Sequence, residues 1–454
     1  MFKLVSTRRL VGQFGDLLGS MGARVLVLPV SGVATILGSR IVVEATGAEG
    51  FAWFSLVISL PLLIPISDFG IGAALTDVVA TDGLNSPRFW STLKKVLSLL
   101  ASISGFATLI AVGMAVFGLW SPLLGVPGGP LMELACAAVA LFAAVGIPLG
   151  AAQRILLSLG KQTLSTLVLG FGGVWSLSAT WVVSLFEASD FALYALAYAS
   201  GPLVAQILLG IVATRILRKA RPPLGVVGKK GKVRVHMVAV PMAIITLSLP
   251  LAYQSDRTVL AHVSSMDQLA SYSLVGLIYT PLLSILSVGG QTLWPMFMTQ
   301  KESNGVRKLY WHGIAIFAIL GIVLASGLIV LGPAITHIVK GNDANLSSPI
   351  STYILFGMLL LLFAAHTTNG MLLMDERGRK LQAVGSVALL VVKVPLSIYL
   401  GSHFGAEGVI ASTIVAVTLC LFIPACVAAP RYWQRRPVEL TDQAKTSATE
   451  KFAR

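Results

Sequence analysis

Three basic residues lie inside apolar segments of this chain, where a charged side chain is costly to place. They are Arg24, Arg257 and Lys393. A charge at the centre of a membrane costs at least about 2.5 kcal/mol, so such residues usually face a polar interior and serve a function. Guanidinium and ammonium groups both bind phosphate. We therefore predict that these three residues line a cationic path for an anionic headgroup.

Arg40 extends this path toward the other side of the membrane. It follows Arg24 by 16 residues, or about 24 Å along a helix that rises 1.5 Å per residue. Both side chains can hold a headgroup at successive depths. Alternatively, each snorkels to the nearer membrane surface. For Arg40 the two interpretations are equal, whereas the depth of Arg24 favours binding.

Two acidic residues could bind a coupling ion. Asp68 lies in the stretch 66–72, where glycines loosen the helix, and a lone carboxylate there could bind Na⁺ or H⁺. It could equally pair with a basic residue or with backbone. Asp256 adjoins Arg257, but adjacent residues on a helix diverge by about 100°. We therefore expect Arg257 in a cavity and Asp256 beside a neighbouring helix.

His366 and Asn369 are polar candidates for the same cavity. A hydrogen bond between two helices is the commoner role for such residues in membranes. Lys393 is the most central of the charges, and an ammonium in a dry cavity can bind phosphate as a point charge.

The elements that position these residues are membrane-spanning helices. Only 11% of the 454 residues are charged and 56% are apolar, whereas about 25% are charged in a soluble domain. A bilayer core of about 30 Å requires about 20 helical residues. We predict an all-α integral membrane protein with twelve transmembrane helices in two parallel six-helix bundles around a central cavity. The predicted spans are 19–41, 51–79, 92–119, 131–158, 163–186, 191–217, 237–258, 268–297, 309–338, 350–374, 381–401 and 407–430.

The distribution of positive charge predicts the orientation. Of the 33 Lys and Arg residues, 28 lie in the two tails and in every second gap between spans. Basic loops remain in the cytoplasm. Both termini are therefore expected in the cytoplasm of a bacterial cell with the chain in its inner membrane, and the net charge of +14 indicates contact with anionic membrane lipids rather than nucleic acid.

Internal similarity predicts the domain organisation. Phe54-Ser55-Leu56-Val57 recurs as Tyr272-Ser273-Leu274-Val275 at an offset of 218, and Gly160-Lys161 recurs as Gly378-Arg379 at the same offset. Six helices per copy make the repeats parallel. We predict bundles at 1–218 and 237–430, a basic cytoplasmic linker at 219–236 and a cytoplasmic tail at 431–454. At this offset Lys393 corresponds to Trp175, so its charge is peculiar to the second half.

The motifs that would indicate an enzyme are absent. The sequence contains no HExxH, GxxxxGK[ST] or GxSxG pattern, and its three cysteines form no CxxC pair. No catalytic residue, cofactor or metal is therefore expected. A polysaccharide polymerase or ligase, which would be an enzyme, would also carry a large outer loop with catalytic residues, and the outer gaps are short.

Four stretches resemble a known family. The first runs from Leu37-Gly38-Ser39-Arg40 through Gly47-Ala48-Glu49-Gly50-Phe51 to Phe54-Ser55-Leu56 and resembles the first-loop motif of the polysaccharide flippases. Ser67-Asp68-Phe69-Gly70-Ile71-Gly72 matches that family's pattern in the second helix. The stretches 256–260 with 272–274, and Gly378-Arg379, resemble its seventh and eleventh helices. The family belongs to the superfamily of multidrug/toxin extrusion antiporters and lipid II flippases.

The resemblance covers most of residues 10–430. It implies a flippase that moves a polyprenyl-pyrophosphate-linked oligosaccharide from the inner to the outer leaflet by alternating access, for cell-surface polysaccharide biosynthesis. A polysaccharide polymerase or a chain-length regulator is a candidate partner. Lys393 has no counterpart in the family's motifs, so its role rests on the physical argument alone.

Three alternatives remain beside this function. A multidrug or solute antiporter of the same superfamily would favour acidic or aromatic residues for cationic drugs, whereas the predicted cavity is cationic. The lipid II flippases resemble a fourteen-helix pattern, and we predict twelve helices. A scaffold without transport activity would leave the intramembrane charges unexplained.

Overall fold

In the computed structural model the described residues are 2–63, 75, 78–79, 83–126, 129–220, 236–299, 303–341, 346–374 and 376–434. Their regular structure is entirely helical. The side chains of 2–26, 28, 62–63, 236–243, 295, 298–299, 303, 376 and 433–434 are not described. Within the described part, nine helices are long and apolar enough to cross a membrane. The chain is therefore an all-α, multi-pass membrane protein.

The chain divides into two compact units. Unit 1 comprises Met1–Ser273 and Ile335–Ser347, and unit 2 comprises Leu274–Ala334 and Ser348–Arg454. The predicted linker at 219–236 lies mostly outside the described residues, so the predicted domain boundaries stay predictions.

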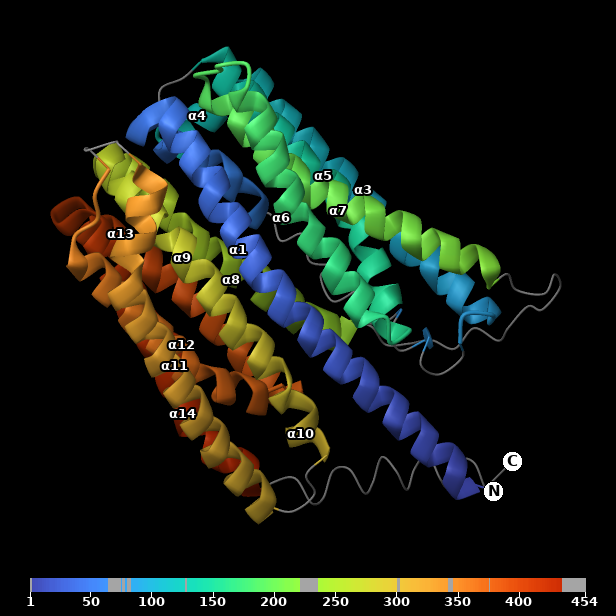
Figure 1. The fold of residues 1–454 in the computed structure, drawn as a ribbon. Helices are drawn as coiled ribbons and strands as arrows, with labels where there is room; N and C mark the ends of the chain where they lie inside the picture. Colours follow the sequence, from blue (N-terminus) through green and yellow to red (C-terminus); the bar gives the residue numbers. More distant parts are fainter. Residues whose placement is uncertain are drawn as a thin grey trace. The chain divides into compact units, whose positions relative to one another are not determined.

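Unit 1 is a bundle of long helices. α1 packs on α6, α7 and α5, while α7 lies between α5 and α6 and α3 covers α5 (Figure 1). Small residues allow the close crossings, as in many membrane helices. At the α6–α7 crossing, a Cβ atom on Gly172 would lie 3.0 Å from the carbonyl oxygen of Gly201. The helices are α1 (Phe2–Leu63), α3 (Pro87–Val116), α4 (Trp120–Leu124), α5 (Pro130–Ser158), α6 (Gln162–Ser184), α7 (Phe191–Lys219), α8 (His236–Val263) and the first turns of α9 (Met266–Gln291).

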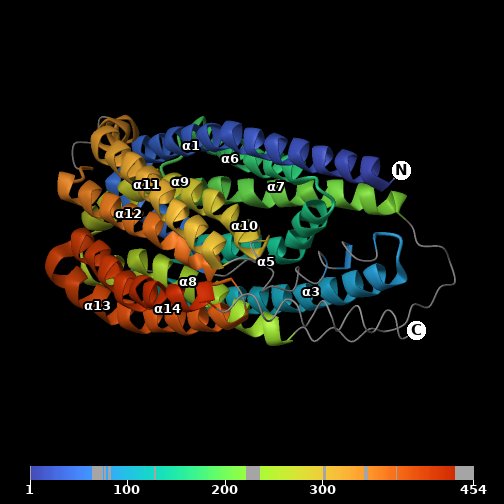
Figure 2. The ribbon, with the colours of Figure 1, turned by 90° about the horizontal axis from the view of Figure 1, so that it is seen from below.

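Unit 2 is built around α12. This helix packs against α10, α13 and α14, and Figure 2 shows α13 and α14 side by side. The unit contains the rest of α9, α10 (Leu293–Thr299), most of α11 (Ser303–Lys340), α12 (Ile350–Leu372), α13 (Glu376–Val417), the π-helix η1 (Thr418–Phe422) and α14 (Ile423–Gln434).

Two bends with the same four-residue sequence replace predicted loops. α1 bends at Gly47, which opens Gly47-Ala48-Glu49-Gly50, and α13 bends at Gly405, which opens Gly405-Ala406-Glu407-Gly408. The two bend glycines have φ values of 70° and 57°, which side chains other than glycine rarely adopt. The fourth glycine is needed for space, because a Cβ atom on Gly50 would collide with Thr46 and one on Gly408 with the carbonyl of Leu400.

Helix boundaries otherwise follow local capping signals. Ser86 accepts a hydrogen bond from the backbone of Phe89 and precedes Pro87 at the first turn of α3. Asp190 caps α7 in the same way. Serine, aspartate and an early proline are favoured at helix N-termini. The predicted outer gap at 120–130 contains a short helix, α4, which the sequence analysis did not foresee.

Candidate functional site

Arg257 on α8 is the best-defined candidate for anion binding in unit 1. Its Nη1 atom lies 3.4 Å from Oε1 of Gln254, which is a long hydrogen bond. Its buried Nε atom has no hydrogen-bond partner among the described residues, and it forms no ion pair with them either. A partly buried guanidinium still requires partners for its five N–H donors. The site can therefore supply several donors to an anionic ligand.

The guanidinium of Arg257 lies within electrostatic range of three other side chains. It interacts with Asp256, Tyr272 and Tyr198, which lie on α8, α9 and α7. Three helices of unit 1 therefore converge on this one cation. A positive charge near a carboxylate that forms no ion pair with it is partly balanced yet remains available to a second anion.

Asp256 points away from Arg257, toward α9. The hydroxyl of Tyr272 donates a hydrogen bond of 2.9 Å to its Oδ2 atom, and the aspartate side chain is only 3% exposed. This bond joins α8 to α9 around the turn between them. The predicted ion-coupling role of Asp256 stays a prediction.

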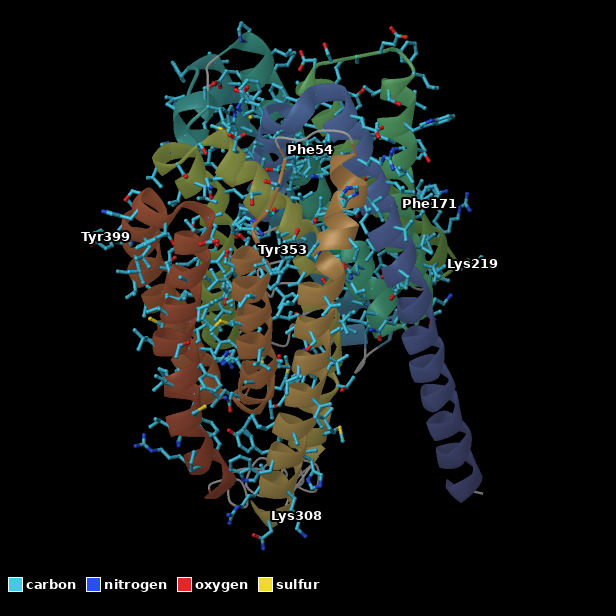
Figure 3. All side chains as sticks on the ribbon, turned by 60° about the vertical axis from the view of Figure 1, so that its left-hand side comes forward. Phe54, Phe171, Lys219, Lys308, Tyr353 and Tyr399 are labelled. Carbon is cyan, nitrogen blue, oxygen red and sulfur yellow. The ribbon has the colours of Figure 1, made fainter. Side chains whose placement is uncertain are left out.

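Tyr198 on α7 is a further site residue, which the sequence analysis did not identify. Its hydroxyl donates at 3.5 Å to Oγ1 of Thr35, and its ring meets the edge of Phe54 at a centroid distance of 5.5 Å (Figure 3 labels Phe54). The Ser176 hydroxyl donates to its backbone carbonyl at 2.7 Å. Tyr198 therefore connects both limbs of α1 with α6 and with Arg257. Sequence spacing gives no signal for such a contact, because its partners lie far apart along the chain.

Arg40 is placed very differently from Arg257. Its Nε atom forms an ion pair of 2.8 Å with Glu44, one turn later on α1, and both side chains are nearly half exposed. Glu44 in turn lies next to Gly341, where a Cβ atom would be 3.2 Å from the carboxylate. The charge of Arg40 is thus neutralised locally at a solvent-accessible position.

Asn369 on α12 joins three helices of unit 2. Tyr310 of α11 donates to its Oδ1 atom at 2.8 Å, and its Nδ2 atom donates to Sγ of Cys426 on α14 at 3.3 Å. The side chain is fully buried. This is the helix–helix hydrogen bonding that the sequence analysis named as the commoner role for such a residue.

His366 and Lys393 are the other two candidates in unit 2. His366 lies one turn before Asn369, and its buried Nδ1 atom has no hydrogen-bond partner within the described part of the chain. Lys393 on α13 is completely buried and interacts with another group of the protein. In Figure 3, the labelled Lys308 lies at the opposite end of unit 2 from Tyr353 and Tyr399.

The predicted site residues thus fall into separate groups. Asp256 and Arg257 lie together in unit 1, with Arg40 at a different, exposed position. His366 and Asn369 share a helix in unit 2, where Lys393 lies on α13. Asp68 lies outside the described residues, and the side chain of Arg24 is not described. Among the described side chains, no three His, Cys, Asp or Glu residues are grouped as a metal site would require.

Comparison with solved structures identifies the class of fold. The sequence matches no family model and no curated protein. The structure resembles that of the MATE multidrug transporter DinF-BH, with a TM-score of 0.67, 16% identity and coverage of 93% of this chain and 96% of that one. An inward-facing MATE multidrug transporter of the MOP superfamily gives a TM-score of 0.66 at 12% identity, covering 90% and 98%.

A flippase has the same fold. The lipid II flippase MurJ in an inward closed conformation gives a TM-score of 0.61 at 15% identity, covering 91% of this chain and 90% of that one. At these identities the comparisons establish the fold alone. The chain has the fold of the MOP superfamily transporters over nearly its whole length, and these structural neighbours are transporters and a flippase rather than enzymes.

Proposed function

We propose that this protein is a flippase of a bacterial inner membrane that moves a polyprenyl-pyrophosphate-linked oligosaccharide from the inner to the outer leaflet. Twelve helices in two parallel six-helix bundles provide alternating access, and both termini lie in the cytoplasm. The proposal rests on the unpaired positive charge of Arg257. A pyrophosphate needs several donors and positive charge along its path, and the Arg257 guanidinium has both, without an ion pair to a described residue.

Other charges of the described chain fit the same substrate. Lys393 is a fully buried cation on α13. The superfamily fold hosts lipid flipping, because one neighbour is a lipid II flippase. A cell-surface glycan polymerase or a chain-length regulator would receive the product on the outer side. We assign His366 and Asn369 to the sugar-facing part of the path, and Asp68 and Asp256 to ion coupling.

The internal repeat supports the two-bundle arrangement. Residues 49–57 and 267–275 align at the offset of 218, with identical residues at the pairs Ala52/Ala270, Ser55/Ser273, Leu56/Leu274 and Val57/Val275. The hydroxyls of Ser55 and Ser273 hydrogen-bond to each other at 2.8 Å, and both are buried. Equivalent positions of the two copies therefore meet at this pair, which joins α1 to the first turns of α9 within unit 1.

A second candidate function is multidrug export, because two of the structural neighbours are named as multidrug transporters. It would move a solute rather than a lipid. The charge of Arg257 opposes this alternative for cationic drugs, because an unpaired, partly buried guanidinium repels them. A lipid II flippase is the other alternative, and it would use the same cation.

The test is the leaflet distribution of the lipid-linked oligosaccharide in cells that lack the protein. We expect the oligosaccharide to accumulate in the inner leaflet and to be cleared by the wild-type chain. Arg257→Gln should fail to clear it, while the matched control Arg40→Gln should retain most activity because Glu44 already neutralises Arg40. Absence of accumulation in the deletion strain would contradict a flippase and would favour drug or solute export.

A further inference from the structure

His262, at the last turn of α8, faces two backbone carbonyls. Its Nδ1 atom lies 2.8 Å from the carbonyl oxygen of Thr258 on the same helix. Its Nε2 atom lies 3.0 Å from the carbonyl oxygen of Pro122 on α4. The side chain is exposed at this end of unit 1. The ring therefore bridges α8 and the short helix of the α3–α5 connection.

The chemistry of the two partners determines the charge of the ring. A backbone carbonyl oxygen only accepts hydrogen bonds, so each ring nitrogen must donate. A neutral imidazole carries one N–H group, whereas an imidazolium carries two. Both contacts can be hydrogen bonds only when His262 is protonated. After loss of the proton, one of the two carbonyls would face a nitrogen lone pair.

The ring fits a site that the local backbone builds for it. Gly125, directly after α4, has a φ of 70°, and a Cβ atom there would lie 2.7 Å from Nδ1 of His262. Only glycine readily adopts this positive φ and also leaves room for the imidazole of His262. The backbone at Gly125 thus packs directly against one part of the exposed imidazole, which supports a specific contact rather than a chance approach of two surface groups.

α4 is also attached to α5. The buried carboxylate of Glu133 accepts from the backbone of Trp120 at 3.1 Å and from the backbone and hydroxyl of Ser121 at 2.8 and 2.7 Å. α5 therefore holds the first two residues of α4, and His262 holds the next residue, Pro122. Loss of the His262 contact would leave α4 attached through Glu133 and free to move relative to α8.

We propose that His262 is a pH-sensitive latch that holds α4 to α8 firmly when it is protonated, with both ring nitrogens donating, and more weakly when it is neutral and keeps only one of the two hydrogen bonds. Histidine is the side chain that most often switches charge near neutral pH in proteins. α8 also carries Arg257, so the latch bears on the helix of the candidate site. This inference stands independently of the proposed function.

The charged groups on the helices around the latch do not pair with the ring. His262 forms no ion pair with any described residue. On α1, which packs on α8, Arg40 and Glu44 neutralise each other, and the Glu133 carboxylate accepts hydrogen bonds from α4. The other charged groups with described side chains on the packed helices α1, α5 and α8 are Glu49, Arg154, Asp256 and Arg257.

The chain contains a matched control histidine. Nδ1 of His312 on α11 lies 2.7 Å from the carbonyl oxygen of Lys308, four residues earlier, as in His262. Among the described residues its ring has no second carbonyl partner. A neutral ring satisfies this geometry, so His312 should not act as a latch.

The experiment measures the mobility of α4 as a function of pH. A spin label is attached to Leu123→Cys, an exposed position on α4, in the full-length protein in lipid vesicles after Cys136, Cys420 and Cys426 have been replaced by Ala. We expect the label to become more mobile as the pH rises from about 5 to about 8. His262→Gln should be mobile at every pH, and His312→Gln should behave as the parent protein does.

Two results would overturn the latch. A label whose mobility does not change with pH in the parent protein would exclude it, whatever the variants show. A pH response that persists in His262→Gln would assign the titration to another group. If His262→Gln does not fold, His262→Asn, which also lacks the imidazole, provides the same comparison.

Discussion

The two predicted site arginines whose side chains are described lie in different environments. Arg40 is paired with Glu44 on α1 and nearly half exposed. Arg257 has a weak bond to an amide and no ion pair within the described chain. An exposed pair contributes little, about 0 to 1 kcal/mol. Of the two, only Arg257 has charge to offer an incoming anion.

Lys393 allows stability and function to be separated at one residue. Lys393→Met keeps the length of the side chain and removes a fully buried charge. Lys393 interacts with another group of the protein, so the substitution leaves that buried group without its partner, which costs about 1 to 3 kcal/mol. We therefore expect lower thermal stability in detergent, and loss of lipid flipping even at temperatures at which the variant stays folded. Normal flipping by the variant would show that Lys393 has a structural role only.

Tyr198 tests whether the surroundings of Arg257 matter. Tyr198→Phe keeps the ring contact with Phe54 and removes the hydroxyl that faces Thr35. Because that hydrogen bond is long, we expect stability to fall by less than about 1 kcal/mol and flipping to fall several-fold. The matched control is Tyr194→Phe, which removes a 2.9 Å bond to the carbonyl of Ala188. Equal flipping by the two variants would contradict a role for Tyr198 at the site.

At the level of the elements, the two glycine bends explain where predicted and observed helices differ. The sequence predicts separate spans at 19–41 and 51–79, and at 381–401 and 407–430. The structure has α1 and α13 running through these gaps with a reversal at Gly47 and Gly405. A glycine with positive φ turns the chain within one residue, so no loop is needed. At the second bend, the Ser351 hydroxyl of α12 donates to the Glu407 carboxylate and fixes the turn.

Gly405→Ala should therefore destabilise the protein. Forcing a side chain into this backbone region costs about 1 to 3 kcal/mol, so we expect a lower midpoint of thermal unfolding in detergent. Gly327→Ala is the control, because nothing lies within 4 Å of its Cβ position and its helical backbone accepts alanine. If the two variants unfold at the same temperature, the strain assigned to Gly405 is wrong.

Span positions were largely predictable from sequence, and side-chain partners were not. The predicted span 131–158 agrees with α5, Pro130–Ser158, within one residue, because hydropathy, Pro130 and the Gly160 turn mark its ends. The bond from Tyr272 to Asp256 and the contacts of Asn369 with Tyr310 and Cys426 depend on which helices lie side by side. Hydropathy does not encode helix neighbours. Arg257 was predictable because a lone charge is conspicuous in an apolar segment.

For the whole molecule, the serine pair at the repeat offset is the most informative contact. Ser55 and Ser273 occupy equivalent positions in the two copies and bond to each other at 2.8 Å. In the proposed transport cycle α1 and α9 move against each other, so this contact breaks at one stage of the cycle. A permanent link between the two helices would then stop transport.

A cross-link tests this expectation. Ser55→Cys with Ser273→Cys, in a chain whose three native cysteines are replaced, should form a disulfide on mild oxidation, since the two hydroxyl oxygens that the sulfur atoms would replace lie only 2.8 Å apart. Oxidation should abolish flipping and reduction should restore it. Each single-cysteine variant should be insensitive to oxidant. A cross-linked protein that still flips lipid would show that this contact stays closed throughout the cycle.

The central claim is that the protein moves a polyprenyl-pyrophosphate-linked oligosaccharide across the membrane and that Arg257 binds the pyrophosphate during this movement. The most direct measurement is flipping of polyprenyl-pyrophosphate-linked oligosaccharide by the purified protein in vesicles, comparing wild type, Arg257→Gln and Arg40→Gln. Hydrogen bonds to charged groups contribute about 1.5 to 3 kcal/mol, so we predict that Arg257→Gln loses about tenfold or more of the rate and that Arg40→Gln stays near wild type. Equal rates for wild type and Arg257→Gln, or no flipping by the wild-type protein, would contradict the account.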